Sequence, residues 1–178
     1  AAVVGPGRLA DATRLLYAGH SRGGHGALLF ATHLPDQSCG VFASNGWIRR
    51  EYYADANPIF DHDVQLSHSG PETIRRAFES AIAENDVGLS AGNMLGLPAL
   101  LRTSAFDGTV SPFFTRRMAR IVKGLERSVL PASSSSSALE LDEFTSDRSK
   151  GHWWWDTQRP NDGGVMFDSK VRKFFSKS

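Results

Sequence analysis

The sequence has little of three features that would narrow its class at once: cysteine, net charge and long apolar runs. Its 178 residues include one cysteine, Cys39, so no internal disulfide can form and the redox compartment stays open. The 20 Lys and Arg residues balance 19 Asp and Glu residues, which disfavours a protein that binds nucleic acid or a membrane surface. No apolar run reaches about 18 residues, so we expect a soluble protein without a membrane-spanning helix.

Signals for a metal or a cofactor are also lacking. No spacing of histidines and carboxylates is typical of zinc ligands, and Cys39 is interpreted as a small buried residue. We therefore expect no metal and no cofactor. The opening segment "AAVVGPGRLADA" begins without Met and lacks the long apolar core of a signal peptide, which indicates a cut, processed or incomplete start.

What the sequence does have is an alternation of apolar runs with amphipathic segments, the pattern of βαβ units around a parallel sheet. It predicts one α/β domain over residues 1–178, with a mostly parallel sheet between two layers of helices. The predicted strands are Thr13–Ala18, Cys39–Ser44, Leu97–Ser104 and Ala138–Thr145, the last of them half exposed at an edge. The predicted helices are Gly24–Leu34, Pro71–Glu84, Pro112–Leu125 and Val165–Phe175.

Two segments fit neither the helix period nor the strand period. Residues 47–68, "WIRREYYADANPIFDHDVQLSH", are interpreted as an insertion that caps one end of the sheet. Residues 131–138 contain five consecutive serines and are predicted to form a mobile surface loop.

The segment Leu15–Phe30, "LLYAGHSRGGHGALLF", carries the clearest chemical signal. The spacing Gly19-x-Ser21-x-Gly23 is typical of a sharp strand-to-helix turn that raises one serine above a sheet. An ordinary turn serine is the alternative, but the flanking glycines disfavour it. A serine hydroxyl needs a base to remove its proton and a carboxylate to orient that base, so an acid and a histidine should follow in the chain.

Asp107 is the best candidate for the acid, because it follows the predicted strand Leu97–Ser104 at the carboxyl edge of the sheet. His152 in "KGHWWWDT" is the best candidate for the base, and Gly151 gives it a bend. Asp107 as a helix cap and His152 as a structural histidine remain open. Weaker candidates occur in the irregular segment, where they follow no strand: Asp61, Asp63, His62 and His68.

The motifs "GHSRGG", "FDGTVSPFFTRRMARIVKGL" and "GHWWWDT" together resemble the catalytic domain of the prolyl oligopeptidase-like (S9-type) α/β-hydrolases. The resemblance implies that Ser21 is the nucleophile, Asp107 the acid and His152 the base. Separations of 86 and 45 positions between these residues suit the family. It also implies that the backbone N–H of Arg22 is one oxyanion donor.

Two departures from the family pattern matter. Arg22 occupies the position where peptidases of this group usually have an aromatic residue, so ester hydrolysis is as well supported as peptide hydrolysis. In the family the serine turn follows the fifth strand, so this chain resembles the C-terminal half of an α/β-hydrolase domain. We therefore expect the upstream half of the domain, or another protein chain, to dock on the edge of the strand Thr13–Ala18 and to supply the second oxyanion donor.

The resulting hypothesis is a serine hydrolase that cleaves an ester or peptide bond through an acyl-enzyme, incomplete as this chain alone. The candidate substrate contacts are His20, Trp153 and Tyr52. The alternative is a non-catalytic, hydrolase-like structural subunit of a larger assembly. Arg22 and the truncated start favour that alternative, whereas the full set of serine, acid and histidine argues against it.

Overall fold

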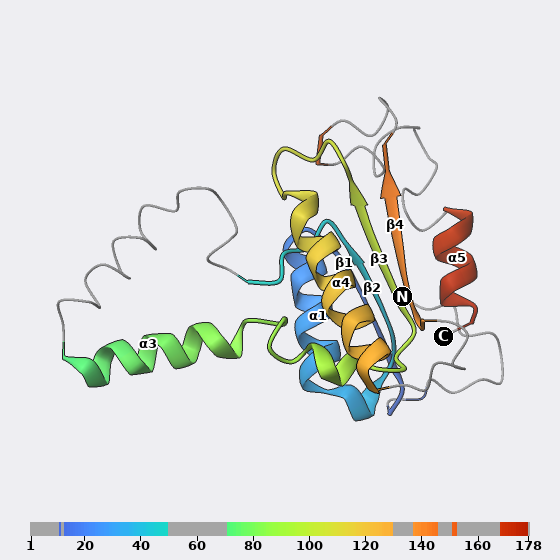
Figure 1. Ribbon diagram of the computed structural model, residues 1–178. Helices are drawn as coiled ribbons and strands as arrows, with labels where there is room; N and C mark the ends of the chain where they lie inside the picture. The colour runs from blue at the N-terminus through green and yellow to red at the C-terminus, as the bar shows by residue number, and fades with distance from the viewer. Residues whose placement is uncertain are drawn as a thin grey trace.

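A computed structural model describes residue 11 and residues 13–49, 71–129, 137–145, 151–152 and 168–177 of the chain. Within them one sheet contains β1 (Leu15–His20), β2 (Ser38–Ser44), β3 (Ala99–Ser104) and β4 (Leu139–Phe144). Figure 1 shows these strands side by side in the order β1-β2-β3-β4, and each neighbouring pair is parallel. The predicted parallel sheet is confirmed.

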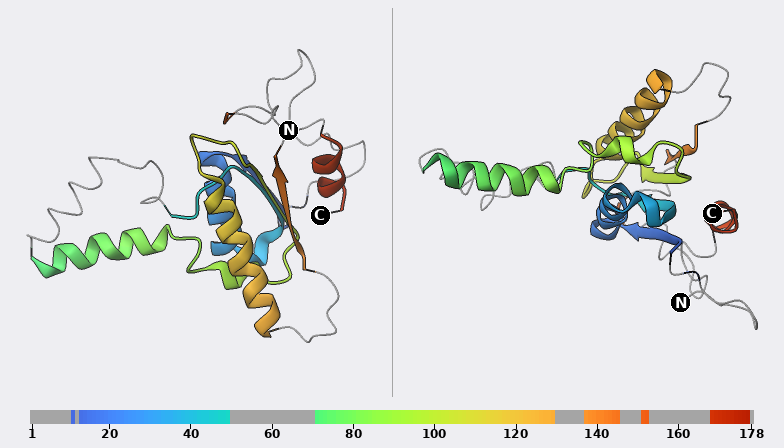
Figure 2. Two further views of the ribbon diagram at one scale, coloured as in Figure 1. Left: turned by 45° about the horizontal axis from the view of Figure 1, so that its top comes forward. Right: turned by 90° about the horizontal axis from the view of Figure 1, so that it is seen from below.

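Helices cover both faces of this sheet. The helices are α1 (Arg22–His33), α3 (Glu72–Glu84), α4 (Pro112–Val129) and α5 (Ser169–Phe175), with short 3₁₀ turns at Pro35–Gln37 and Ala91–Met94. Helices α1 and α4 lie on one face, while α5 lies on the other (Figures 1 and 2). The predicted three-layer α/β/α architecture is therefore confirmed.

Alternating side chains on the central strands fill the two cores. Val41 and Ala43 of β2 belong to the core beneath α1 and α4, whereas Phe42 belongs to the core beneath α5. There the ring of Phe42 meets the ring of Phe175 edge-on, with centroids 5.9 Å apart. Because both faces of the sheet are covered, β3 is buried along its whole length and β2 from Gly40 to Ser44. Burial on both faces is usual for parallel strands.

The ends of the elements differ by a few residues from the sequence prediction. Strand β1 ends two residues later than expected, because Gly19 and His20 continue the ladder opposite Ala43 and Ser44. Helix α4 extends four residues further, to Val129. Of the predicted insertion, Trp47 is buried in the core, and residues 50–68 lie outside the described residues. Residues 131–136 of the predicted loop, and residues 165–167 of the predicted last helix, also lie outside them.

Strand β1 forms one edge of the described sheet, since within the described residues it pairs with β2 alone. Its residues Leu15, Leu16 and Tyr17 are half-buried. The ring of Tyr17 stacks on that of Phe30 from α1 at 5.5 Å, and the Phe30 side chain remains 52% exposed. In the described part of the chain, this edge therefore exposes apolar side chains, and the backbone of β1 is hydrogen-bonded to a neighbouring strand on one side.

A buried arginine joins the sheet to α5. Arg102 of β3 is 1% exposed and forms ion pairs with Asp142 of β4 at 2.7 Å and with Asp168 at 3.1 Å. Asp168 is also the N-cap of α5, where its carboxylate accepts the backbone N–H groups of Lys170 and Val171. These contacts fix the first turn of α5 against the carboxyl half of β3 and β4.

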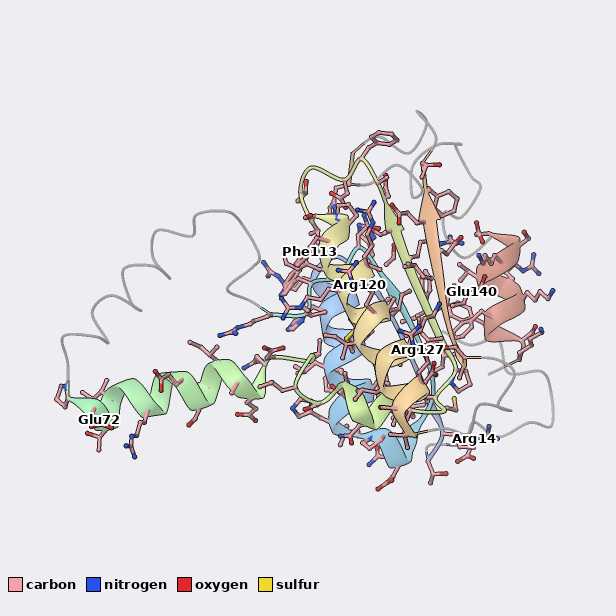
Figure 3. All side chains as sticks on the ribbon, in the orientation of Figure 1. Arg14, Glu72, Phe113, Arg120, Arg127 and Glu140 are labelled. Atoms are coloured by element: carbon pink, nitrogen blue, oxygen red, sulfur yellow. The ribbon has the colours of Figure 1, made fainter. Side chains whose placement is uncertain are left out.

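Helix α3 extends away from the sheet (Figures 1 and 2), and Glu72 lies at its outer end (Figure 3). Its Ile74 side chain is 49% exposed. On α4, the side chains of Arg120 and Arg127 are exposed (Figure 3). Across the described ranges, no helix combines the length and the apolar character that crossing a membrane requires.

Candidate active site

Ser21 occupies the sharp turn between β1 and α1. Its backbone angles, φ 57° and ψ −119°, lie in a region that residues with a side chain rarely adopt. The turn is held by two hydrogen bonds: the Ser21 N–H donates to the carbonyl of Ser44 at 2.8 Å, and the Ser21 carbonyl accepts from His25 N–H at 3.0 Å. The predicted strand-to-helix turn is present, with its strain at the serine.

The backbone N–H of Arg22 lies at the first position of α1. The first N–H groups of a helix have no acceptor within the helix, and the helix dipole adds partial positive charge there. Directly after Ser21, this N–H is suited to bind a negatively charged oxygen formed by attack of the serine. The Arg22 side chain itself is exposed.

Asp107 lies three residues beyond β3 and is 5% exposed. Its Oδ1 accepts the backbone N–H groups of Thr109 at 2.8 Å and Val110 at 2.9 Å, which holds the turn that contains it. Its Oδ2 accepts from His152 Nδ1 at 2.7 Å and from the amide of Asn45. Both oxygens of the carboxylate therefore accept hydrogen bonds, and Asp107 does more than cap its own turn.

His152 is buried, with 7% exposure, and follows Gly151, whose φ of 89° provides the bend expected from the sequence. A carboxylate can only accept hydrogen bonds, so the proton between His152 and Asp107 belongs to His152 Nδ1. In neutral His152 the Nε2 atom is then the basic nitrogen. This is the tautomer that a general base for a serine hydroxyl requires.

His20 connects this pair to the serine turn. Its ring lies 4.6 Å from the ring of His152, and it directly precedes Ser21 in the chain. Burial, together with the neighbouring His152, lowers the pKa of His20 to about 4, so the His20 imidazole is neutral near pH 7. Five of the predicted site residues therefore lie at this end of the sheet: His20, Ser21, Arg22, Asp107 and His152.

Two residues in this site were not predicted, Ser44 and Asn45. Asn45 is fully buried and donates to Asp107, while Ser44 Oγ donates to Asn45 Oδ1 at 3.2 Å and contacts His20 Nδ1 at 3.2 Å. Their position at the carboxyl end of β2 was the available signal, because parallel strand ends meet at one edge of the sheet.

Tyr52 and Trp153 lie outside the described residues, as do the weaker candidates named above: Asp61, Asp63, His62 and His68. Among the residues that are described, no group of three or more His, Cys, Asp or Glu side chains could hold a metal ion.

A parallel sheet between helices, with a serine at a strained strand-to-helix turn near an Asp–His pair, is the arrangement of the α/β-hydrolase fold. No protein-family model and no curated protein sequence matches the chain. Solved structures do. An acylaminoacyl peptidase of Pyrococcus horikoshii superposes with a TM-score of 0.59 at 18% identity, covering 94% of this chain and 24% of that chain.

Two further solved structures support the same fold. Porphyromonas gingivalis dipeptidyl peptidase 4 gives a TM-score of 0.61 at 14% identity, covering 93% of this chain and 20% of that chain. A Pyrococcus furiosus esterase gives 0.55 at 14% identity, covering 93% and 54% respectively. At these identities the likeness establishes the fold. The chain has the α/β-hydrolase fold, as its resemblance to S9-type domains implied, and spans a part of each of these larger proteins.

Proposed function

We propose that this chain carries the catalytic triad of a serine hydrolase that cleaves ester or peptide bonds. The observation that supports it most directly is the 2.7 Å hydrogen bond from buried His152 to buried Asp107. Two further observations support it: Ser21 occupies a strained turn, and the ring of His20, its neighbour in the chain, lies 4.6 Å from the ring of His152. Strain of this kind is maintained where the surrounding structure demands it, which is most often at a functional site.

In the proposed reaction, Ser21 Oγ attacks the carbonyl carbon of the substrate while its proton passes to His152 Nε2. Asp107 stabilises the imidazolium that forms and keeps its orientation. The proton then passes to the departing alcohol or amine, which leaves an acyl group on Ser21. A water molecule, deprotonated by His152, attacks this acyl-enzyme and releases the acid, and the proton returns to Ser21.

The developing oxyanion needs donors that are already in place. The Arg22 N–H is one of them, and the other in this fold comes from a loop that precedes the serine turn. We propose that an upstream half of the domain, or another protein chain, pairs with β1 and contributes that loop. The strand edge and the half-exposed apolar side chains around Tyr17 and Phe30 support such docking. Loss of one oxyanion donor reduces kcat by about 10²–10³-fold.

We propose an ester or a peptide as the substrate, and His20, which precedes Ser21 in the chain, as a residue that contacts it. Tyr52 and Trp153 remain candidate contacts from the sequence. A non-catalytic structural subunit is the competing proposal, and it predicts a folded protein whose Ser21 is not reactive.

The test is labelling by a fluorophosphonate probe. It compares the full-length natural polypeptide, its Ser21→Ala variant, a Ser128→Ala control at an exposed serine, and the 178-residue chain alone. Labelling that survives Ser128→Ala and is lost in Ser21→Ala supports the hydrolase. Weaker labelling of the 178-residue chain than of the full-length polypeptide supports a second oxyanion donor from outside this chain. A folded full-length protein that resists labelling rejects the hydrolase in favour of the structural subunit.

Substrate class is tested separately with the labelled enzyme. Hydrolysis of p-nitrophenyl butyrate is compared with hydrolysis of an aminoacyl p-nitroanilide at equal concentrations. The ester is intrinsically more reactive than the anilide. An esterase is indicated if the enzyme hydrolyses the ester faster by more than that intrinsic difference, and a peptidase is indicated if it cleaves the anilide efficiently.

A further inference from the structure

Asn45 has an unusual position for a buried polar residue. It follows the last residue of β2, is 0% exposed and has a φ of 49°. Its backbone N–H donates to the carbonyl of Arg102 at 2.8 Å, which fixes it between the ends of β2 and β3. Its side chain is therefore held in front of the turn that carries Asp107.

The orientation of the Asn45 amide follows from its partners. Asp107 can only accept, so the Asn45 Nδ2 group faces Asp107 Oδ2 and Asn45 Oδ1 faces Ser44. The Ser44 hydroxyl donates to Asn45 Oδ1 and also lies 3.2 Å from His20 Nδ1. Donation therefore runs from Ser44 through Asn45 to Asp107, and the His20 ring contacts the Ser44 end of this chain.

Two hydrogen-bond donors share one oxygen of the Asp107 carboxylate. Oδ1 is held by the backbone of its own loop, whereas Oδ2 receives both Asn45 Nδ2 and His152 Nδ1. Without Asn45, the loop would still hold Oδ1, but no side chain would fix the plane of the carboxylate toward His152. A hydrogen bond to a buried charged group is also stronger than one between neutral groups.

We propose that Asn45 is a positioning residue for the Asp107–His152 pair, with Ser44 and His20 fixing the direction of its amide. This inference rests on the serine-hydrolase function proposed above. Asn45 touches neither substrate nor reacting atoms in this role. It acts by setting the direction from which Asp107 meets His152.

The discriminating variants are Asn45→Ala and Asn45→Asp in the full-length polypeptide. Asn45→Ala removes the donor at every pH, so the rate constant of fluorophosphonate labelling should fall roughly ten- to 100-fold at all pH values. Asn45→Asp keeps the size of the side chain and its tolerance of positive φ, but it places two carboxyl groups against each other. One of them takes up a proton as the pH falls and regains the ability to donate.

The expected signature is therefore a difference in pH dependence. Relative to the wild type, the labelling deficit of Asn45→Asp should narrow from pH 8 to pH 6, whereas that of Asn45→Ala should stay constant. A purely structural role would lower stability in both variants without this difference. Thr32→Val is the matched control, since Thr32 is a fully buried polar residue whose hydroxyl, among the described residues, bonds within its own helix, to Leu28, Leu29 and His33. Thr32→Val should lower the melting temperature and leave the labelling rate unchanged.

A second measurement does not depend on catalysis. The proton shared by His152 and Asp107 should give a low-field resonance in the ¹H NMR spectrum, assigned by its loss in Asp107→Asn. In Asn45→Ala this resonance should shift or broaden, and in Thr32→Val it should not. If the wild type is not labelled, the hydrolase proposal fails while the resonance still tests Asn45. If both Asn45 variants label as the wild type does and leave the resonance in place, the positioning role is overturned.

Discussion

Gly19 and Gly23 meet backbone to backbone across the serine turn. A Cβ atom on Gly19 would lie 2.1 Å from the carbonyl oxygen of Gly23 and 2.9 Å from its Cα atom. The end of β1 and the start of α1 can therefore approach this closely only if residue 19 lacks a side chain. This contact is what confines Ser21 to its tight turn, since the chain must reverse within one residue.

Gly19→Ala should therefore damage both the stability and the site. Because the obstructing atoms are backbone, they cannot rotate away, and we expect a loss of about 2–4 kcal/mol in the free energy of unfolding. Gly26→Ala is the control in the helix that follows the turn, α1, where an added Cβ meets nothing within 4 Å. It should stabilise α1 by about 0.5–1 kcal/mol. Urea denaturation of the two variants measures the difference, and equal effects would contradict the role assigned to Gly19.

Asp107→Asn should abolish most of the activity while the fold persists. An asparagine can still accept the backbone N–H groups of Thr109 and Val110 through its oxygen. Its amide nitrogen would then face His152 and favour the wrong tautomer, so kcat should fall by about 10³–10⁴-fold. Ester hydrolysis and the melting temperature are measured together. Asp36→Asn makes the same chemical change at an exposed position and should leave both unchanged.

His20 should make the protein less stable in mild acid. Its pKa falls to about 4 in the folded state, against an ordinary value of 6.5, because burial and His152 disfavour the charged imidazole. Between these two pH values the unfolded chain binds more protons, so the free energy of unfolding decreases as the pH falls from 6.5 toward 4.

His20→Asn tests this pH dependence, since an amide can donate to Ser44 but does not titrate. The variant should lose less stability than the wild type between pH 7 and pH 4.5, as measured by thermal melting. His25 also has a pKa lowered by burial, but it is present in both proteins and cancels in the comparison. Parallel curves for the two proteins would show that His20 does not contribute.

Arg102→Met should destabilise the protein by about 2–3 kcal/mol. The substitution removes the buried cation that Asp142 and Asp168 share, while Asp142 keeps its ion pair with Lys170. Arg76→Ala, which breaks the exposed i,i+4 pair with Glu72, should cost less than about 0.5 kcal/mol. Chemical denaturation compares the two. Limited proteolysis of Arg102→Met should cut near α5 first, since Asp168 anchors that helix.

Much of this site could be predicted from the sequence because its signals are local. The spacing Gly19-x-Ser21-x-Gly23 specifies a turn through the backbone alone, and Gly151 before His152 specifies a bend that the structure contains. The period of the apolar residues likewise predicted the strands and helices to within a few residues. These features depend on neighbours in the chain, which a sequence displays directly.

The contacts of Asn45 and Arg102 depend instead on which strands lie side by side. Asn45 meets Asp107 across 62 positions because β2 pairs with β3 in one particular register. Arg102 meets Asp142 because β4 joins the other side of β3. The sequence by itself therefore determined the serine turn, the candidate acid and base and the alternation of strands and helices. Only the tertiary structure decided the polar network behind Asp107, because strand order and register are set by packing over the whole sheet.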